Sequence, residues 1–113
     1  MTRVYVPTTL EGLERLRDDG SLPASAERYV ADGDSEEQEY AALMAAAADA
    51  AELLESPGRR VVVVADLGDP DGAVPLRDVV AVHADAVDRA ADADPDDDLA
   101  WYAVQELDVL LQG

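Results

Sequence analysis

The stretch Arg59-Arg-Val-Val-Val-Val-Ala-Asp66 is a continuous run of β-branched residues behind two arginines. It is too short for a buried helix, and it lacks the polar alternation of a strand with one solvated face. We therefore expect this stretch to be the central strand of a sheet that is covered on both faces. A turn is expected directly after it, because glycine, proline and aspartate follow in residues 68–72.

Two further strands are expected on either side of this stretch in the sequence. Residues 3–6 alternate polar and apolar side chains and stop at Pro7, so they predict a short first strand. Residues 78–84 predict the last strand. The connection of about a dozen residues that leads to it suits an antiparallel hairpin better than a parallel crossover, which normally carries a helix.

Three helices are indicated by their capping signals. Thr8 and Glu11 have the spacing of a capping box, and Gly20 supplies a terminator. Ser35 and Gln38 form a second capping box, and Pro57-Gly58 ends that helix. Its apolar residues recur at helical spacing: Tyr40, Leu43, Met44, Ala47, Ala51 and Leu54. A final helix is expected from Asp94, as N-cap before Pro95, to Leu111.

These elements predict an α+β fold in the order β-α-α-β-β-α, as a single domain over residues 1–113. The expected sheet has three strands, mixed or antiparallel, and is packed with the three helices. Residues 21–33 are expected to be a loop with a short structured piece around Tyr29 and Val30. The 21 alanines and the absence of phenylalanine predict a thin core.

The charge of the chain limits what it can bind. It has 113 residues with 26 Asp and Glu against 8 Arg and no Lys, so the net charge is −18. Such a surface repels phosphate, and direct binding to nucleic acid or to an anionic membrane is not expected. The absence of cysteine excludes disulfides and thiolate metal sites. The opening residues lack a signal-peptide pattern, so we expect a cytoplasmic protein.

No cofactor or metal site is predicted. Neither acidic cluster fits a calcium-binding EF-hand loop, because Leu67 and Leu43 fall at ligand positions and no Glu closes either loop. Acidic residues at helix starts have a simpler role in stabilising the helix dipole. The acidity as a whole fits a solvating surface, and the alternative is a mimic of nucleic acid that occupies a basic groove.

His83 is the only histidine, so any acid–base chemistry must involve it. It lies on the expected last strand, at the edge of the sheet, with Asp85 two residues further on. Because Asp66 should lie about 13 Å away, the most obvious His–Asp pair is not formed. An enzyme that depends on His83 is therefore the third hypothesis, behind the two binding functions.

The expected C-terminal helix carries the candidate binding residues. Its core stripe spans about 140°, and Trp101 and Tyr102 fall outside this stripe on opposite sides, beside Asp108 and Val109 respectively. One interpretation is that both rings fold back and close the core. The other is a recognition face, since partly exposed Trp and Tyr often anchor protein interfaces. The preferred hypothesis is a non-enzymatic protein-binding or regulatory module that uses these four residues against a partner with a basic surface.

Several segments of the sequence are familiar when they are taken in order. They are RVYVP at residues 3–7, EEQEYAAL at 36–43, RRVVVVAD at 59–66, VVAVH at 79–83 and LAWYAVQEL at 99–107. Together they resemble a small acidic actinobacterial family of unknown function, here in a shortened form. The resemblance implies a bacterial cytoplasmic context, and it implies no activity and no site residues.

Overall fold

The structure, a computed structural model, describes residues 1–113 except 32, 34, 55–57, 90–92, 95–96 and 113. Its elements follow the chain in this order: β1 (Thr2–Thr8), α1 (Leu10–Asp19), β2 (Ser21–Leu22), β3 (Tyr29–Val30), α2 (Glu36–Glu52), β4 (Val61–Leu67), β5 (Val74–Pro75), the 3-10 turn η1 (Leu76–Asp78), β6 (Val79–Ala84), β7 (Ala100–Tyr102), the 3-10 turn η2 (Val104–Glu106) and α3 (Leu107–Gln112).

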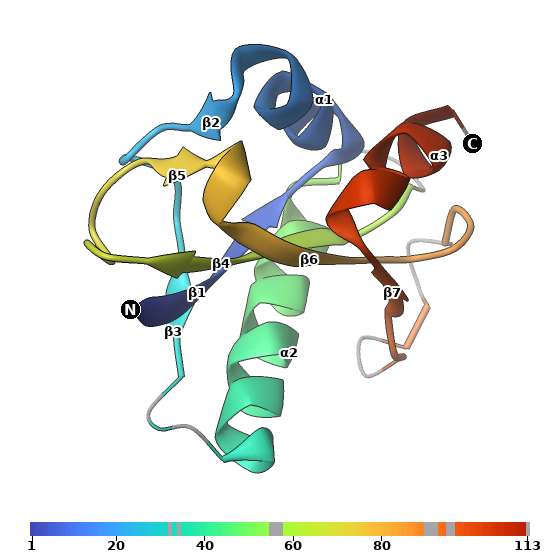
Figure 1. The fold of residues 1–113 in the computed structure, drawn as a ribbon. Coiled ribbons are helices and arrows are strands. Elements are labelled where there is room, and N and C mark those ends of the chain that lie inside the picture. The colour runs from blue at the N-terminus through green and yellow to red at the C-terminus, as the bar shows by residue number, and fades with distance from the viewer. Residues whose placement is uncertain (32, 34, 55–57, 90–92, 95–96, 113) are drawn as a thin grey trace.

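The valine-rich strand β4 is the centre of a five-stranded sheet in the order β3-β1-β4-β6-β7. Every neighbouring pair in this sheet is antiparallel. The strands β2 and β5 form a separate two-stranded sheet. Figure 1 shows α2 on one side of the large sheet, and α1, α3 and the small sheet on the other. The α+β fold and the antiparallel pairing of the last two predicted strands are thus confirmed, whereas the expected three-stranded sheet is too small.

Two hydrophobic clusters explain why β4 is buried along its length. Alternate residues of β4 point to opposite faces of the sheet. Val61 and Val63 join the cluster under α1 and α3, which includes Leu13 and Leu107. Val62 and Val64 join the cluster under α2. Each fully buried valine stabilises the fold by about 2 kcal/mol. Because its side chains alternate between the two faces, this short strand contributes to both hydrophobic clusters.

The first two helices begin near their expected capping signals. The N-cap of α1 is Thr9, whose side chain accepts the N–H of Gly12, one residue later than expected. The helix ends at Gly20, which has a φ of 82°, a left-handed conformation that favours glycine. The capping box of Ser35 and Gln38 is present at the start of α2.

Helix α2 packs through alanines. Its buried residues are Ala42, Ala46, Ala47 and Ala50, whereas Tyr40 is 51% exposed and Leu43 and Met44 are only partly buried. The sheet supplies the bulk on this side, from Tyr5, Val62 and Val64. The expected apolar face is therefore rotated, because small side chains let the helix lie close to the large residues of the sheet.

The prediction of one helix from Asp94 to Leu111 is wrong. Residues 100–102 instead form β7, which pairs with residues 82–84 of β6. Of the residues described in this segment, only 107–112 are α-helical. Because β7 covers the side of β6 that faces away from β4, β6 is an internal strand and His83 does not lie at the edge of the sheet. Pro95, part of the expected helix start, lies outside the described residues.

A buried ion pair fixes the end at which β4 begins and β6 ends. Arg60 is fully buried, and its guanidinium donates to both carboxylate oxygens of Asp85, at 3.0 and 2.8 Å. The backbone N–H of Arg60 also donates to Asp85 Oδ2, and the Asp85 N–H donates to the carbonyl of Arg60. A further hydrogen bond from Arg60 Nη2 to the carbonyl of Asp97 attaches the segment that leads into β7.

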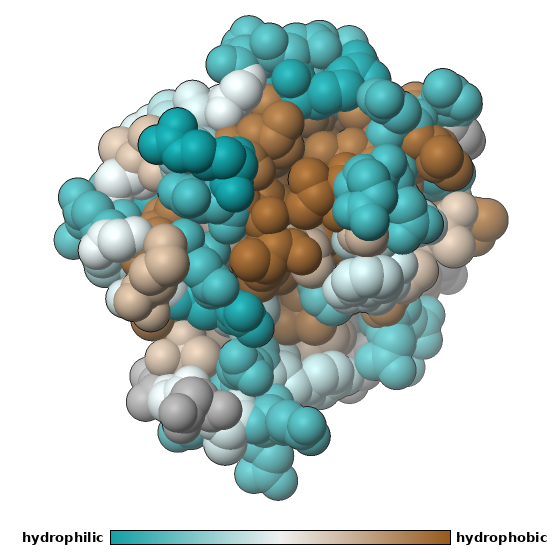
Figure 2. Space-filling model, viewed as in Figure 1, coloured by the Kyte–Doolittle hydropathy of each residue, from teal (hydrophilic) through white to brown (hydrophobic). Residues whose placement is uncertain are grey.

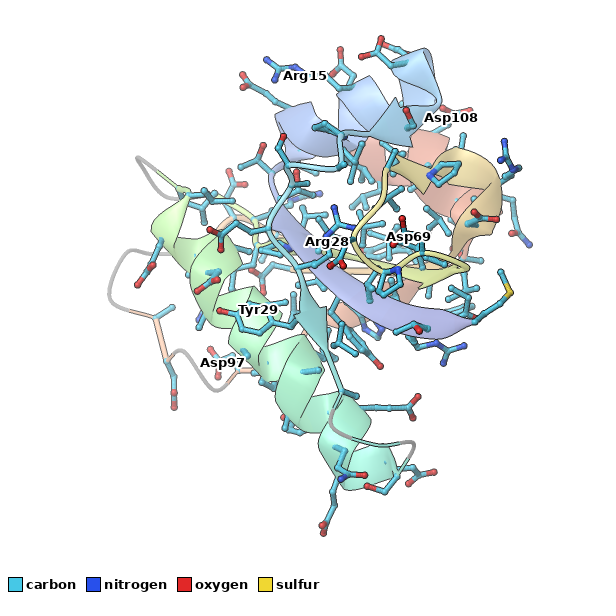
Figure 3. The ribbon with its side chains drawn as sticks, turned by 90° about the vertical axis from the view of Figure 1, so that its left-hand side faces the viewer. Arg15, Arg28, Tyr29, Asp69, Asp97 and Asp108 are labelled. Carbon is cyan, nitrogen blue, oxygen red and sulfur yellow. The ribbon has the colours of Figure 1, made fainter. Side chains whose placement is uncertain are left out.

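A second arginine joins two loops. Arg28 donates to the carbonyls of Pro70 and Gly72, at 2.9 and 2.6 Å, and to three carbonyls of its own loop, those of Pro23, Ala24 and Ala26. Figure 3 shows Arg28 near the turn that carries Asp69. This planar cation therefore closes the side of the molecule where β2 and β5 meet.

We expect Asp85→Asn to lower the free energy of unfolding by about 3 kcal/mol at neutral pH, because it leaves the charge of Arg60 buried without its carboxylate. Burial alone raises the pKa of Asp85, but the hydrogen bonds from Arg60 hold it below its ordinary value. The contribution of this carboxylate is thus complete above about pH 4 and is lost as the pH falls further. Urea unfolding against pH measures both effects.

The matched control for Asp85 is Asp66→Asn. Asp66 makes the same kind of pair with Arg3, at 2.9 Å, but on the surface. Its loss should cost less than about 1 kcal/mol. Equal losses in the two variants would contradict the structural role assigned to the buried pair.

We expect Arg28→Lys to lower the free energy of unfolding by about 1–2 kcal/mol, because an ammonium cannot span carbonyls of two loops as a planar guanidinium does. Hydrogen exchange should quicken first in residues 70–75. The exposed Arg15 offers the control, since Arg15→Lys should change stability by less than about 0.5 kcal/mol. Unchanged exchange in Arg28→Lys would show that the two loops hold together without this cation.

Candidate functional site

Trp101 lies on β7, at one edge of the five-stranded sheet (Figure 1). It stands opposite His83, which in turn stands opposite Val62, so all three side chains share the face that α2 covers. Helix α2 packs mainly on β1, β3 and β4. The Trp101 side chain is 60% exposed.

Tyr102 points to the opposite face of the same strand. It pairs with Val82 and packs, partly buried, against the cluster under α1 and α3. Successive residues of a strand alternate between faces, so the two neighbouring rings cannot form one aromatic surface. In the structure, Tyr102 contributes to the core, and Trp101 faces solvent.

The other two candidate residues lie on α3. Asp108 forms an ion pair with Arg17 of α1, at 3.3 Å, and Val109 is 67% exposed. The expected helix placed all four candidates on neighbouring turns, whereas the structure divides them between an edge strand and a separate short helix. Trp101 and Val109 are the two that present open apolar surface.

His83 lies between Val62 and Trp101 on the α2 side of the sheet. It is half-buried, and burial lowers the pKa of its imidazole. Both oxygens of Asp85, the nearest carboxylate in sequence, are held by Arg60, so this carboxylate is committed to the arginine. Among the described residues, His83 has no side-chain hydrogen bond of the kind that would orient a catalytic imidazole.

Acidic side chains lie at the start of β7. Asp97 and Asp98 precede it and are exposed, and Asp98 accepts a hydrogen bond from Tyr40 Oη at 3.0 Å. Asp108 follows it, on α3. Figure 3 shows Asp97 and Asp108 well apart on the molecule. The carboxylates next to the exposed edge are therefore those of Asp97, which lies 3.6 Å from Arg89, and Asp98, whereas Asp108 is paired with Arg17.

A second surface feature is a hollow lined by carboxylates. A depression of about 490 Å³ at the end of α2 is lined by Pro7, Ala26, Leu53 and three carboxylates, those of Glu27, Asp49 and Glu52. Asp49 is already the acceptor for Tyr29 Oη, at 2.6 Å. In the part of the chain that the structure describes, no group of three or more His, Asp or Glu residues is placed to hold a metal ion.

Apolar surface gathers on the face opposite α2. Figure 2 shows it in a hollow between α1, η1 and α3, above β6. Partly buried side chains from these elements and from η2 pack there against the core, namely Leu76, Val104 and Leu111. This face of the sheet is the one to which Tyr102 points.

These features define a small α+β protein with an antiparallel sheet and an exposed tryptophan at the sheet edge. The chain belongs to the family of unknown function DUF6912, whose model matches residues 2–111. This match confirms the resemblance to an uncharacterised family, and it assigns no site residue. Neither a curated protein nor a solved structure matches the chain significantly. No helix within the described residues is long and apolar enough to cross a membrane.

We expect the free energy of unfolding of the wild type to fall relative to that of His83→Gln as the pH is lowered from about 7.5 through and below the ordinary histidine value of about 6.5. Because the pKa of His83 is lower in the folded protein than the usual value of about 6.5, the unfolded chain binds a proton more readily. The destabilisation begins as the pH falls through the unfolded value and is complete below the folded one. Urea unfolding of both proteins across this range tests it, and parallel pH profiles would contradict it.

Proposed function

We propose that this protein is a non-enzymatic binding module that recognises a partner protein with a basic surface, through the edge of the sheet at Trp101. The observation that carries the proposal is the exposure of this side chain. Trp101 is the only tryptophan in a chain with a thin core, yet it is 60% exposed. Tryptophan is among the residues that most often supply the binding energy of protein interfaces.

Charge supports a basic partner. The net charge is −18, and several arginines contact carboxylates of the same chain, including Arg3, Arg17, Arg60 and Arg89. The carboxylates of Asp97 and Asp98 are exposed at the start of β7, where Asp97 lies 3.6 Å from Arg89 and Asp98 accepts from Tyr40 Oη. A partner rich in Lys or Arg would gain favourable electrostatics on approach, which raises the rate of association more than the final affinity.

The proposal places the module in the cytoplasm, with an apolar contact at its centre and acidic residues at its rim. This arrangement differs from a mimic of nucleic acid, in which the charge alone binds a basic groove. Binding by charge alone falls steeply with salt, whereas burial of an indole ring is non-directional and depends little on salt. Salt dependence therefore separates the two functions.

We expect Trp101→Ala to abolish capture of a defined partner from nuclease-treated native lysate, with a loss in affinity of at least about 2 kcal/mol. The matched control is Val30→Ala, at the opposite edge of the same sheet, where the side chain is 48% exposed. This control should retain the partner. Quantitative mass spectrometry of the captured proteins across a salt series provides the measurement.

Retention of the same partner by Trp101→Ala would contradict the proposal. Capture of many nucleic-acid-binding proteins, all released by moderate salt and unaffected by either substitution, would instead support the mimic. Circular dichroism of both variants confirms that they are folded before capture.

A further inference from the structure

The direction of the backbone groups of β7 follows from one hydrogen bond. The N–H of Asp85 donates to the carbonyl of Arg60, so at this position the backbone of β6 points toward β4. Backbone groups of successive strand residues point to alternate sides. His83 therefore also points toward β4, whereas Ala84 and Val82 point toward β7.

The same alternation continues into β7. Ala84 is opposite Ala100, and Val82 is opposite Tyr102, so these are the hydrogen-bonded pairs. Trp101, opposite His83, belongs to a non-hydrogen-bonded pair, and its N–H and C=O point away from the sheet. Among the described residues no strand pairs with this outer side. The next outward N–H, that of Ala103, is already bonded to Glu106 Oε1, at 3.0 Å.

The exposed edge of β7 can thus pair with one more strand over a short length. Trp101 offers one N–H and one C=O, and a single facing residue of an antiparallel strand can bond both. The side chain of the facing residue would lie on the Trp101 face of the sheet, and those of the residues immediately before and after it would lie on the opposite face. The opposite face is the side of Tyr102 and α3.

Natural proteins protect exposed edges with charged side chains, prolines or bulges. The outer edge of β7 is short, but its central residue is an exposed tryptophan rather than a charged residue. A second copy of this chain is a poor occupant, because each copy carries a net charge of −18. An occupant with positive charge is favoured by the net charge of −18 and by the exposed Asp97 and Asp98 that precede the strand.

We propose that an extended, Lys- or Arg-rich segment of a partner protein adds to β7 as an antiparallel strand and pairs with Trp101. The inference rests on the proposed function and specifies how the partner binds. Its main-chain hydrogen bonds would give affinity, and its alternating side chains, apolar beside Trp101 and basic toward the carboxylates of Asp97 and Asp98, would give specificity.

The test is amide hydrogen exchange by NMR on the ¹⁵N-labelled protein, with a synthetic peptide of alternating valine and lysine as the probe. In the free protein the Trp101 amide should exchange rapidly, while the amides of Ala100 and Tyr102 are protected. On addition of the peptide, exchange of the Trp101 amide should slow by at least about tenfold. The control peptide has the same side chains but is N-methylated at its central residues, so it cannot donate to the edge, and it should give no protection.

Each other result overturns strand addition and bears differently on the proposed function. Equal shifts of the Trp101 indole signal with both peptides, without amide protection, would show binding through side chains alone and would leave the binding module intact. Protection of the Trp101 amide in the free protein that increases with protein concentration would show self-pairing. No response to either peptide, together with a captured partner that still requires Trp101, would exclude strand addition by a basic segment but keep the module.

Discussion

Burial of the valine-rich strand β4 on both faces is the constraint from which the rest of the architecture follows. Neither Val61 and Val63 nor Val62 and Val64 can face water without cost, so a layer must cover each side. With 113 residues, the chain builds these layers economically: one alanine-rich helix on one side, and two short helices with a two-stranded sheet on the other. The ion pair of Arg60 and Asp85 lies where the apolar residues of β4 and β6 stop, and its hydrogen bonds join the two strands at that end.

Local signals in the sequence were sufficient for the elements that carry their own pattern. The strands β1, β4 and β6, the antiparallel pairing of the last two, and the capping box of α2 could all be predicted from spacing and residue type. A short structured piece was expected at Tyr29 and Val30, where β3 lies, but its strand pairing was not, and β7 was missed, because two or three residues are too few to show a period of two. These strands exist because β1 and β6 each leave one side of their backbone unpaired, which is a property of the sheet rather than of residues 29–30 or 100–102.

The C-terminal segment shows how tertiary pairing overrides local propensity. Alanine and leucine at helical spacing indicate a helix through residues 99–111, but Trp101 and Tyr102 are also good strand residues. The hydrogen bond from Arg60 to the carbonyl of Asp97 directs the chain onto β6 just before this point. Residue type alone indicated Trp101 and Tyr102 as candidates, but the arrangement of their rings depends on the secondary structure. Adjacent side chains diverge by about 100° on a helix and point to opposite faces on a strand. The edge at Trp101 was missed for the same reason.

The alanine face of α2 limits how far the sequence can vary. Ala46 and Ala47 are fully buried in the cluster under α2, against Tyr5, Val62 and Val64 of the sheet. A larger residue at either position would push the helix outward, and overpacking of this kind costs about 1–3 kcal/mol. Substitutions that enlarge these side chains should therefore be purged by selection even though they preserve hydrophobicity, while the solvent-facing positions of the same helix remain free to drift. The buried face of α2 therefore restricts the volume of its side chains more than their polarity.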